Sequence, residues 1–170
     1  MPTSVRAFFF LFAIAAAFAC SEAQDSVDYS GLVKFDTATI RIVTPVGVTR
    51  LRVELARSGE QRTMGLMERR TLPDSAGMLF LYDRDEPATS GFWMYRTHIP
   101  LDIAFLDSSG RVVAVRQMTP CTATLASGCP TYEAGVPYRA ALEVNAGALA
   151  RHGIAPGAQV DLPVHREGAW

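Results

Sequence analysis

Residues 101–118, LDIAFLDSSGRVVAVRQM, contain the clearest structural signal in the chain. The flanking runs LDIAFLD and RVVAVRQM are rich in apolar and β-branched residues, which favour strands. Between them Asp107, Ser108, Ser109 and Gly110 form a polar quartet of turn-forming residues, where the chain can reverse its direction. The stretch therefore predicts a β-hairpin.

Further strands are expected on both sides of this hairpin. The segment 48–56 places Leu51, Val53 and Leu55 on one face and charged residues on the other, which is the pattern of a half-buried strand. The other predicted strands are 39–44, 77–82, 91–95, 138–144 and 158–164.

Two short helices are predicted between these strands. Ser58 is followed three residues later by Gln61, a capping box at the start of a helix over residues 59–70. Within this helix Met64 and Met67 are spaced to face the core.

The second helix, residues 146–152, is expected to be capped by Asn145 and ended by Gly153. With about eight short strands and these two helices, we predict a mainly β fold. The expected architecture is a compact antiparallel β-sandwich or small barrel with one or two short helices.

The N-terminus has the pattern of an export signal. Arg6 precedes thirteen residues, 7–19, without a charge or a hydrogen-bonding side chain, and a membrane-spanning helix needs about 20 apolar residues. We therefore predict that residues 1–19 are a cleaved signal peptide. The sequence AFAC loosely resembles a lipobox, so Cys20 is expected to be lipidated; ordinary signal peptidase cleavage is the alternative.

The expected domain organisation follows from this signal. Residues 20–36 are polar and without a burial period, which predicts a flexible tether; residues 37–166 form a single β-rich domain and 167–170 a tail. The residue after Cys20 is Ser21, and a serine at this position is typical of lipoproteins that are forwarded to the outer membrane. We expect an exported, periplasmic protein held at the outer membrane by Cys20.

The two remaining cysteines and the net charge limit the classes of function that the sequence supports. Cys121 and Cys129 are separated by seven residues and are expected to form a disulfide in an oxidising compartment. A formal net charge of −1 gives no support for nucleic-acid binding. No HExxH, CxxC or GxSxG pattern occurs, so we predict no metal and no cofactor.

An ordered series of motifs resembles the bacterial and archaeal family named domain of unknown function 192. The resemblance covers about residues 48–163 and implies a compact, mainly β fold and frequent export, while the family's activity is not established. This chain departs from it at Tyr95 and Arg96, where the family commonly has Lys-Asn. The motifs are QRTMGLMERR at 61–70, GMLFLY at 77–82, FWMYRTHIPLDIAFLD at 92–107, PC at 120–121, CPTY at 129–132 and ALEVNAG at 141–147.

An aromatic cluster supplies the first candidate for binding. On a strand over residues 91–95, Phe92 and Met94 point to one side while Trp93 and Tyr95 point to the other. One pair then belongs to the core, and the other lines a surface or cleft able to stack on a sugar or an aromatic ligand. Burial of both pairs is the alternative.

Several ionisable residues supply further candidates. His98 and Asp102 flank Pro100 and are candidates for a general base or metal ligands, or His98 bonds the backbone of the proline turn. Glu143 is either a buried acid with a raised pKa or a residue facing polar partners. Cys121 is a candidate nucleophile if it is not in a disulfide.

These observations favour a noncatalytic envelope module over an enzyme. The expected partner is a small molecule, a glycan or an envelope protein, and a lipid anchor would add contact with the membrane. The alternatives are a hydrolytic or thiol-based enzyme that uses His98 and Asp102 with Glu143 or Cys121, and a purely structural lipoprotein. The candidate binding face consists of Trp93, Tyr95, His98, Asp102, Tyr132 and Glu143.

Overall fold

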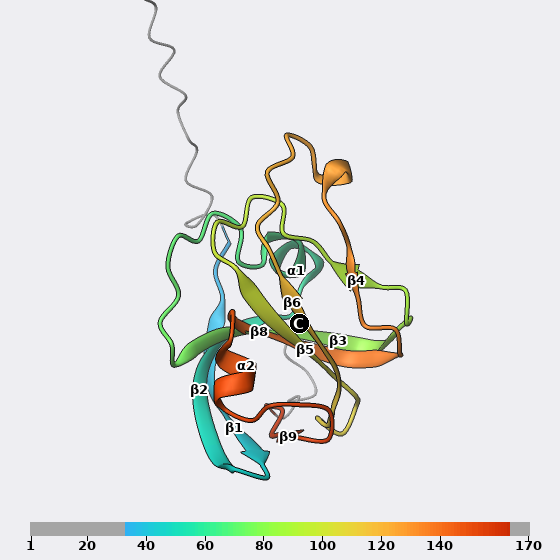
Figure 1. The fold of residues 1–170 in the computed structure, drawn as a ribbon. Coiled ribbons are helices and arrows are strands. Elements are labelled where there is room, and N and C mark those ends of the chain that lie inside the picture. The colour runs from blue at the N-terminus through green and yellow to red at the C-terminus, as the bar shows by residue number, and fades with distance from the viewer. Residues whose placement is uncertain (1–32, 164–170) are drawn as a thin grey trace, which may run out of the picture.

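A computed structural model describes residues 33–163, in which a curled seven-stranded sheet, a two-stranded sheet and two short α-helices occur (Figure 1). The predicted mainly β class is confirmed. The elements are β1 (Asp36–Thr44), β2 (Gly47–Ala56), α1 (Gly59–Met64), β3 (Ala76–Glu86), β4 (Gly91–Phe92), β5 (Leu101–Leu106), β6 (Val112–Met118), the 3-10 turn η2 (Ala126–Gly128), β7 (Tyr132–Glu133), β8 (Tyr138–Asn145), α2 (Ala148–Arg151) and β9 (Gln159–Val160).

The predicted signal peptide, Cys20, most of the predicted tether and the predicted tail lie outside these described residues. Within residues 33–163, no helix is long and apolar enough to cross a bilayer.

The predicted hairpin is confirmed as β5 and β6, which pair antiparallel along their length. At the turn the Asp107 carboxylate accepts hydrogen bonds from the backbone nitrogens of Ser109 (2.9 Å) and Arg111 (3.0 Å), and Gly110 takes the left-handed conformation at φ 82°. On its other edge β5 pairs with β8, and all six residues of β5 are buried. The hairpin thus contributes a central strand.

The seven strands follow the order β6-β5-β8-β3-β2-β1-β9. Residues at the start of β6 meet β9: the backbone nitrogen of Val160 donates to the oxygen of Gly110 (2.8 Å), and that of Val112 donates to the oxygen of Ala158 (2.9 Å). The ends of the sheet therefore approach each other in a half-barrel. One pairing corrects the antiparallel expectation, because β2 and β3 are parallel; the segment from α1 to residue 75 carries the chain back across the sheet.

Two cores lie on opposite faces of the sheet. Along β5, Ala104 and Leu106 belong to the first, whereas Ile103 and Phe105 belong to the second. The first, here called the α2 core, includes Leu149 of α2. The second, here called the aromatic core, consists of buried residues Ala56, Leu66, Met78, Phe80, Met94, Leu101, Ile103, Phe105, Ala114, Met118, Ala134, Tyr138 and Ala141.

The first helix is shorter than predicted, although its capping box is confirmed. The Ser58 hydroxyl accepts from the Gln61 nitrogen (3.1 Å), and the Gln61 side chain accepts from the Ser58 nitrogen (3.0 Å). The helix ends at Met64 instead of residue 70, because Gly65 takes a positive φ of 48°. The expectation that Met64 and Met67 face the core is wrong, since both are half-buried.

Other boundaries also differ from the sequence prediction. β3 continues to Glu86 instead of ending at residue 82, and β4 ends at Phe92 instead of residue 95. Asn145 is not the cap of α2, because its side chain donates to the backbone oxygen of Leu72 (2.7 Å) and Gly147 precedes the helix instead.

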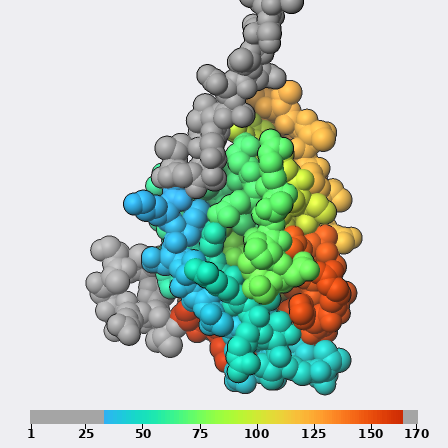
Figure 2. Space-filling model, turned by 90° about the vertical axis from the view of Figure 1, so that its left-hand side faces the viewer, coloured from blue at the N-terminus to red at the C-terminus, as the bar shows by residue number. Residues whose placement is uncertain are grey.

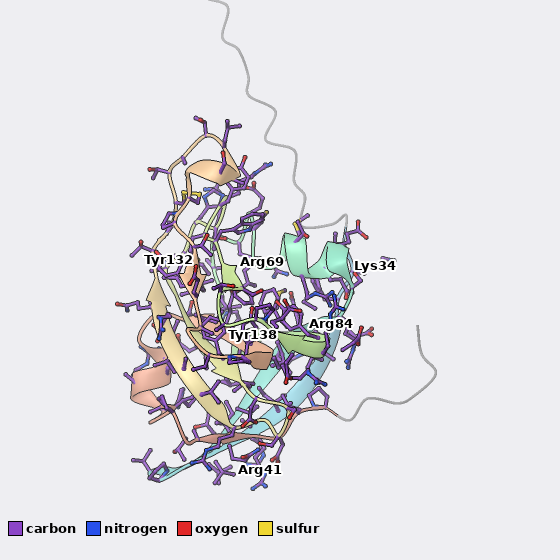
Figure 3. The ribbon with its side chains drawn as sticks, turned by 90° about the vertical axis from the view of Figure 1, so that its right-hand side faces the viewer. Lys34, Arg41, Arg69, Arg84, Tyr132 and Tyr138 are labelled. Carbon is purple, nitrogen blue, oxygen red and sulfur yellow. A yellow bond between two sulfur atoms is a disulfide. The ribbon has the colours of Figure 1, made fainter. Side chains whose placement is uncertain are left out.

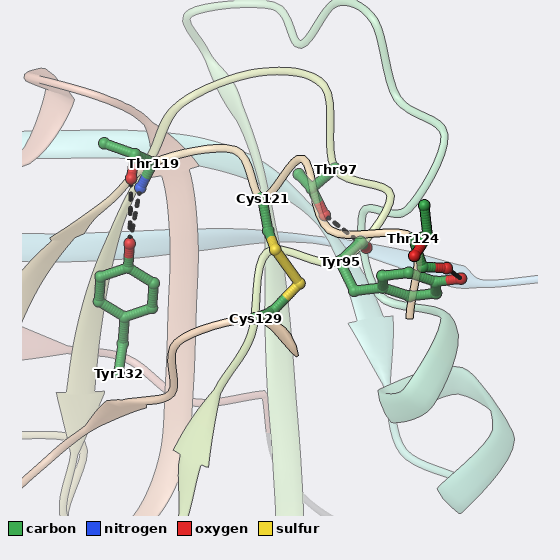
Figure 4. Close-up of a disulfide and its surroundings, with 7 residues drawn as sticks. All are labelled: Tyr95, Thr97, Thr119, Cys121, Thr124, Cys129 and Tyr132. Carbon is green, nitrogen blue, oxygen red and sulfur yellow. Dashed lines mark hydrogen bonds between the residues drawn. A yellow bond between two sulfur atoms is a disulfide. The ribbon is translucent and has the colours of Figure 1, made fainter. Parts of the chain in front are cut away.

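Cys121 and Cys129 form the predicted disulfide (Figure 4). The loop they close carries η2 and the exposed Leu125. This cysteine loop, residues 121–129, lies at the opposite end of the molecule from the β1–β2 turn (orange and cyan in Figure 2).

Removing this disulfide should destabilise the folded domain. In Cys121→Ser/Cys129→Ser the unfolded chain regains the freedom of the open loop, so the free energy of unfolding should fall by about 2.5 kcal/mol. Urea denaturation under oxidising conditions measures the change, and Cys20→Ser, which keeps the pair, is the control. Equal stability of the wild type and the double variant would contradict the prediction.

Candidate functional site

A cavity of about 410 Å³ borders the aromatic core. Its walls come from α1 and the loop after it, from β3, and from the segment that includes β4 (Figure 1). One residue of β8 also borders it, Glu143. The lining residues are Gly59, Arg62, Thr63, Met64, Gly65, Leu66, Met67, Phe80, Tyr82, Glu86, Gly91, Phe92, Trp93, Thr97 and Glu143.

Glu143 is the most unusual group in this cavity. It is 4% exposed, and its cross-strand neighbours Met78 and Ile103 are both fully buried apolar residues. Among the described residues no group hydrogen-bonds its carboxyl. Burial without a compensating partner raises the pKa of Glu143 to about 8. The sequence left two interpretations of Glu143 open. The interpretation as a buried acid is confirmed, and the interpretation as a residue that faces polar partners is wrong.

The other charged groups that line the cavity have partners in the protein. The Arg62 guanidinium donates to the backbone oxygens of Leu81 (3.0 Å) and Arg57 and lies 4.9 Å from the ring centroid of Tyr82. The Glu86 carboxylate accepts from the Ser90 hydroxyl (3.3 Å).

Two phenol groups lie in or beside this region. The Tyr82 ring borders the cavity and contacts the Tyr138 ring edge-on, with centroids 5.7 Å apart. Figure 3 shows Tyr138 at the centre of the molecule. Burial raises the pKa of Tyr82 far above its ordinary range and that of Tyr138 to about 12. Both phenols are therefore neutral at physiological pH.

Aromatic rings form much of the apolar wall. The Phe92 ring contacts that of Phe80 edge-on, with centroids 4.9 Å apart. Trp93 is 45% exposed and borders both the cavity and solvent. Gly65 allows the loop after α1 to approach this wall, because a Cβ there would lie 3.3 Å from the Phe80 ring.

The alternation predicted for residues 92–95 agrees with these positions. Met94 is fully buried and Phe92 packs against the aromatic core, whereas Trp93 is exposed. Tyr95 does not border the cavity, and its hydroxyl donates to the backbone oxygen of Thr124 in the cysteine loop (3.3 Å; Figure 4).

Of the six predicted binding residues, the structure brings Trp93 and Glu143 to the same cavity. Tyr132 lies elsewhere, below the cysteine loop (Figure 3), and its hydroxyl accepts from the backbone nitrogen of Thr119 (3.1 Å; Figure 4). Asp102 lies on the opposite face of the sheet from Glu143, where its carboxylate accepts from the Leu149 nitrogen (3.2 Å).

His98 belongs to a separate ion-pair cluster. Its Nε2 lies 3.0 Å from the Glu68 carboxylate, which also accepts from Arg96. These hydrogen bonds hold the pKa of Glu68 below its usual value, and the bond to His98 has the largest effect. Glu68 and Arg96 both have positive φ, and the Glu68 nitrogen donates to the Arg96 oxygen (2.7 Å). The cluster thus joins two loops.

This cluster corrects two expectations for His98. Its partner is Glu68 and not the backbone of the proline turn. Within the described residues His98 and Asp102 do not hydrogen-bond each other, so they form no catalytic pair. Cys121 is held in the disulfide and is not a free thiolate. Over residues 33–163, no three His, Cys, Asp or Glu side chains are grouped to hold a metal ion.

No sequence pattern marked Arg62, Thr97 or the loop after α1 as parts of the cavity. Gly65 was the available signal, since a glycine inside a helical pattern can mark its end. A helix predicted to end at Gly65 would have placed Met67 in the following loop, where it borders the cavity.

The buried acid should make stability fall as pH rises. The ordinary pKa of a glutamic acid is 4.5 and that of folded Glu143 about 8, so between these values the unfolded chain loses a proton that the folded protein keeps. Each pH unit in this window should lower the free energy of unfolding by about 1.4 kcal/mol. Glu143→Gln should remove this slope and be the more stable protein at pH 8.

Urea denaturation at pH 5, 6, 7 and 8 measures the difference between the two slopes. Glu133→Gln, which removes an exposed carboxylate, is the matched control and should keep the wild-type slope. Parallel profiles for the wild type and Glu143→Gln would show that the prediction is wrong.

Two solved structures resemble this chain over most of its length. A protein of unknown function from Novosphingobium aromaticivorans DSM 12444 is 32% identical, with a TM-score of 0.69, and the match covers 78% of this chain and 89% of that one. A protein from Sinorhizobium meliloti 1021, described as a candidate transcription regulator, is 32% identical with a TM-score of 0.68; the match covers 76% of this chain and 95% of that one.

Comparison with curated proteins finds no match. The family model DUF192, described as an uncharacterized ACR, matches residues 41–162, which include the whole cavity. This range agrees with the one that the sequence motifs indicated. The chain belongs to the DUF192 family.

Proposed function

We propose that this protein is a noncatalytic binding protein that holds a small molecule in the cavity beside Glu143. The observation that carries the proposal is the Glu143 carboxyl, which is 4% exposed, borders the cavity and has no hydrogen-bond partner among the described residues. Buried polar groups in proteins are nearly always hydrogen-bonded, and an unpaired one costs free energy. A ligand with a complementary polar group would supply the partner.

The size and lining of the cavity support this proposal. Its volume of about 410 Å³ lies within the range of about 300 to 1,000 Å³ that is typical of small-molecule sites. Such sites contain aromatic side chains and polar groups that orient the ligand. Here Phe80, Phe92 and Trp93 are among the aromatic residues of the lining, and Arg62 and Glu143 are among its polar residues.

A binding role is better supported than a catalytic one, because the candidate catalytic residues are dispersed. Glu143 borders the cavity, Asp102 lies on the other face of the sheet and His98 is paired with Glu68. A thiol mechanism needs a free Cys121, which the disulfide removes.

We further propose that the protein is exported and anchored to the outer membrane through a lipidated Cys20. The apolar run 7–19 and the AFAC sequence support this proposal. The disulfide between Cys121 and Cys129 is also consistent with an oxidising compartment.

Ligands should be detectable through Trp93. In Trp170→Phe, Trp93 is the sole tryptophan, and its emission should shift when a metabolite from a library enters the cavity. Amide resonances of residues 59–67 should move with it. Met67→Tyr partly fills the cavity and should weaken binding at least tenfold, whereas Leu125→Tyr on the remote cysteine loop should not.

A library of glycans and metabolites that leaves both Trp93 emission and these resonances unchanged would contradict the binding function. Equal effects of Met67→Tyr and Leu125→Tyr would show that ligands bind elsewhere.

The anchor is tested at the N-terminus. Mass spectrometry of the protein from its native membranes should find Cys20 as the first residue, carrying acyl chains. Cys20→Ser should move the protein out of the membrane fraction while Cys121 and Cys129 stay paired. Recovery of the wild type from the cytosol with Met1 attached and both cysteines reduced would refute the export proposal.

A further inference from the structure

We propose that the ligand of this cavity is a small organic cation, an amine or guanidine on an apolar body, whose cationic head hydrogen-bonds the Glu143 carboxylate. This inference rests on the proposed function and adds the chemical class of the ligand. It is carried by the distribution of charge and of aromatic surface around the cavity.

The charged residues of the cavity differ in whether the protein supplies them with a hydrogen-bond partner. The Arg62 guanidinium donates to two backbone oxygens and lies over Tyr82, and Glu86 accepts from Ser90. Glu143 has no such partner among the described residues. Glu143 is therefore the ionisable group of the cavity that is left to pair with a ligand.

A cation meets this requirement better than a neutral or anionic ligand. An ionised carboxylate accepts hydrogen bonds and donates none. The Glu143 side chain is 4% exposed and lies among apolar residues, so attraction to an opposite charge is stronger there than at the open surface. Once Glu143 is ionised, an anionic head would be repelled and a neutral donor would leave the charge uncompensated, so only a cation stabilises the ionised form.

The walls also suit a cation with an apolar body. Phe80, Phe92 and Trp93 border the cavity, and the face of an aromatic ring attracts ammonium and guanidinium groups. The cavity already contains one such contact, because the Arg62 guanidinium lies 4.9 Å from the centroid of the Tyr82 ring. Half-buried Met67 adds polarizable apolar surface for the ligand body.

Binding of a cation should release one proton. Without ligand, Glu143 keeps its proton up to about pH 8. The protonated protein and the cation then form the ion pair, and the carboxyl proton passes to the buffer. The other titratable groups bordering the cavity are Arg62 from α1 and Tyr82 and Glu86 from β3. Tyr82 stays neutral, and Arg62 and Glu86 keep their protein partners.

Three probes of similar size and different charge test the inference: phenethylamine, 2-phenylethanol and phenylacetate. Isothermal titration of the full-length protein, at pH 6, 7 and 8 in buffers of different ionisation enthalpy, gives the Kd and the number of protons released. Phenethylamine should bind at least tenfold more tightly than the other two and release one proton at pH 6. Its Kd should rise about tenfold for each unit by which the pH is lowered below 8, because the proton must leave Glu143 before the ion pair forms.

Glu143→Gln is the decisive variant, because it keeps the shape and removes the charge. It should weaken phenethylamine binding at pH 8 at least tenfold and abolish its pH dependence, while weak binding of 2-phenylethanol remains. Glu86→Gln, which changes the other carboxylate of the cavity, should keep the proton release and the pH dependence.

The outcomes separate this inference from the proposed function. If library compounds bind beside Trp93 but phenethylamine shows no advantage over 2-phenylethanol or phenylacetate, the cation inference is overturned and the binding function stands. If phenethylamine binds equally well to Glu143→Gln, the inference is likewise overturned. If no library compound and none of the three probes binds, both proposals fail.

Discussion

The alternation of side chains along β8 is the constraint on which the rest of this structure depends. Leu142 and Val144 enter the α2 core, while Ala141 and Glu143 face the aromatic core. Because both faces of β8 are covered, a shift of one residue in its pairing would exchange the two sets and place the carboxyl in the α2 core. The same register that packs the sheet therefore fixes Glu143 beside the cavity.

The segment that lies over Glu143 exists because β2 and β3 are parallel. A parallel neighbour requires a crossover, and here the crossover begins with α1 and the loop after it, which form one wall of the cavity. Gly65 ends the helix early, so the following loop turns toward Phe80 in place of another helical turn. The Glu68–Arg96 hydrogen bonds then tie this loop to the segment after β4.

The features that the sequence predicts correctly depend on residues that are close together in the chain. The hairpin at Asp107, the capping box at Ser58 and the spacing of Cys121 and Cys129 each depend on residues close in the chain. The partner of His98 and the cross-strand neighbours of Glu143 are set by strand order and by loops that meet across 30 or more residues, which periodicity does not encode. Sequence thus named Trp93 and Glu143 as candidates without showing that they share a cavity.

A carboxyl beside Met78 and Ile103 calls for a physical reason. A methionine or leucine of similar size would pack there without any cost of desolvation, whereas a carboxyl must either keep its proton or find a partner. The fold provides no partner among its described residues, yet it leaves the carboxyl bordering open volume instead of sealing it in the core. A group that lowers stability and faces a cavity is typical of sites where stability is sacrificed for binding. On this argument the position of Glu143 is better explained by what enters the cavity than by the packing of the sheet.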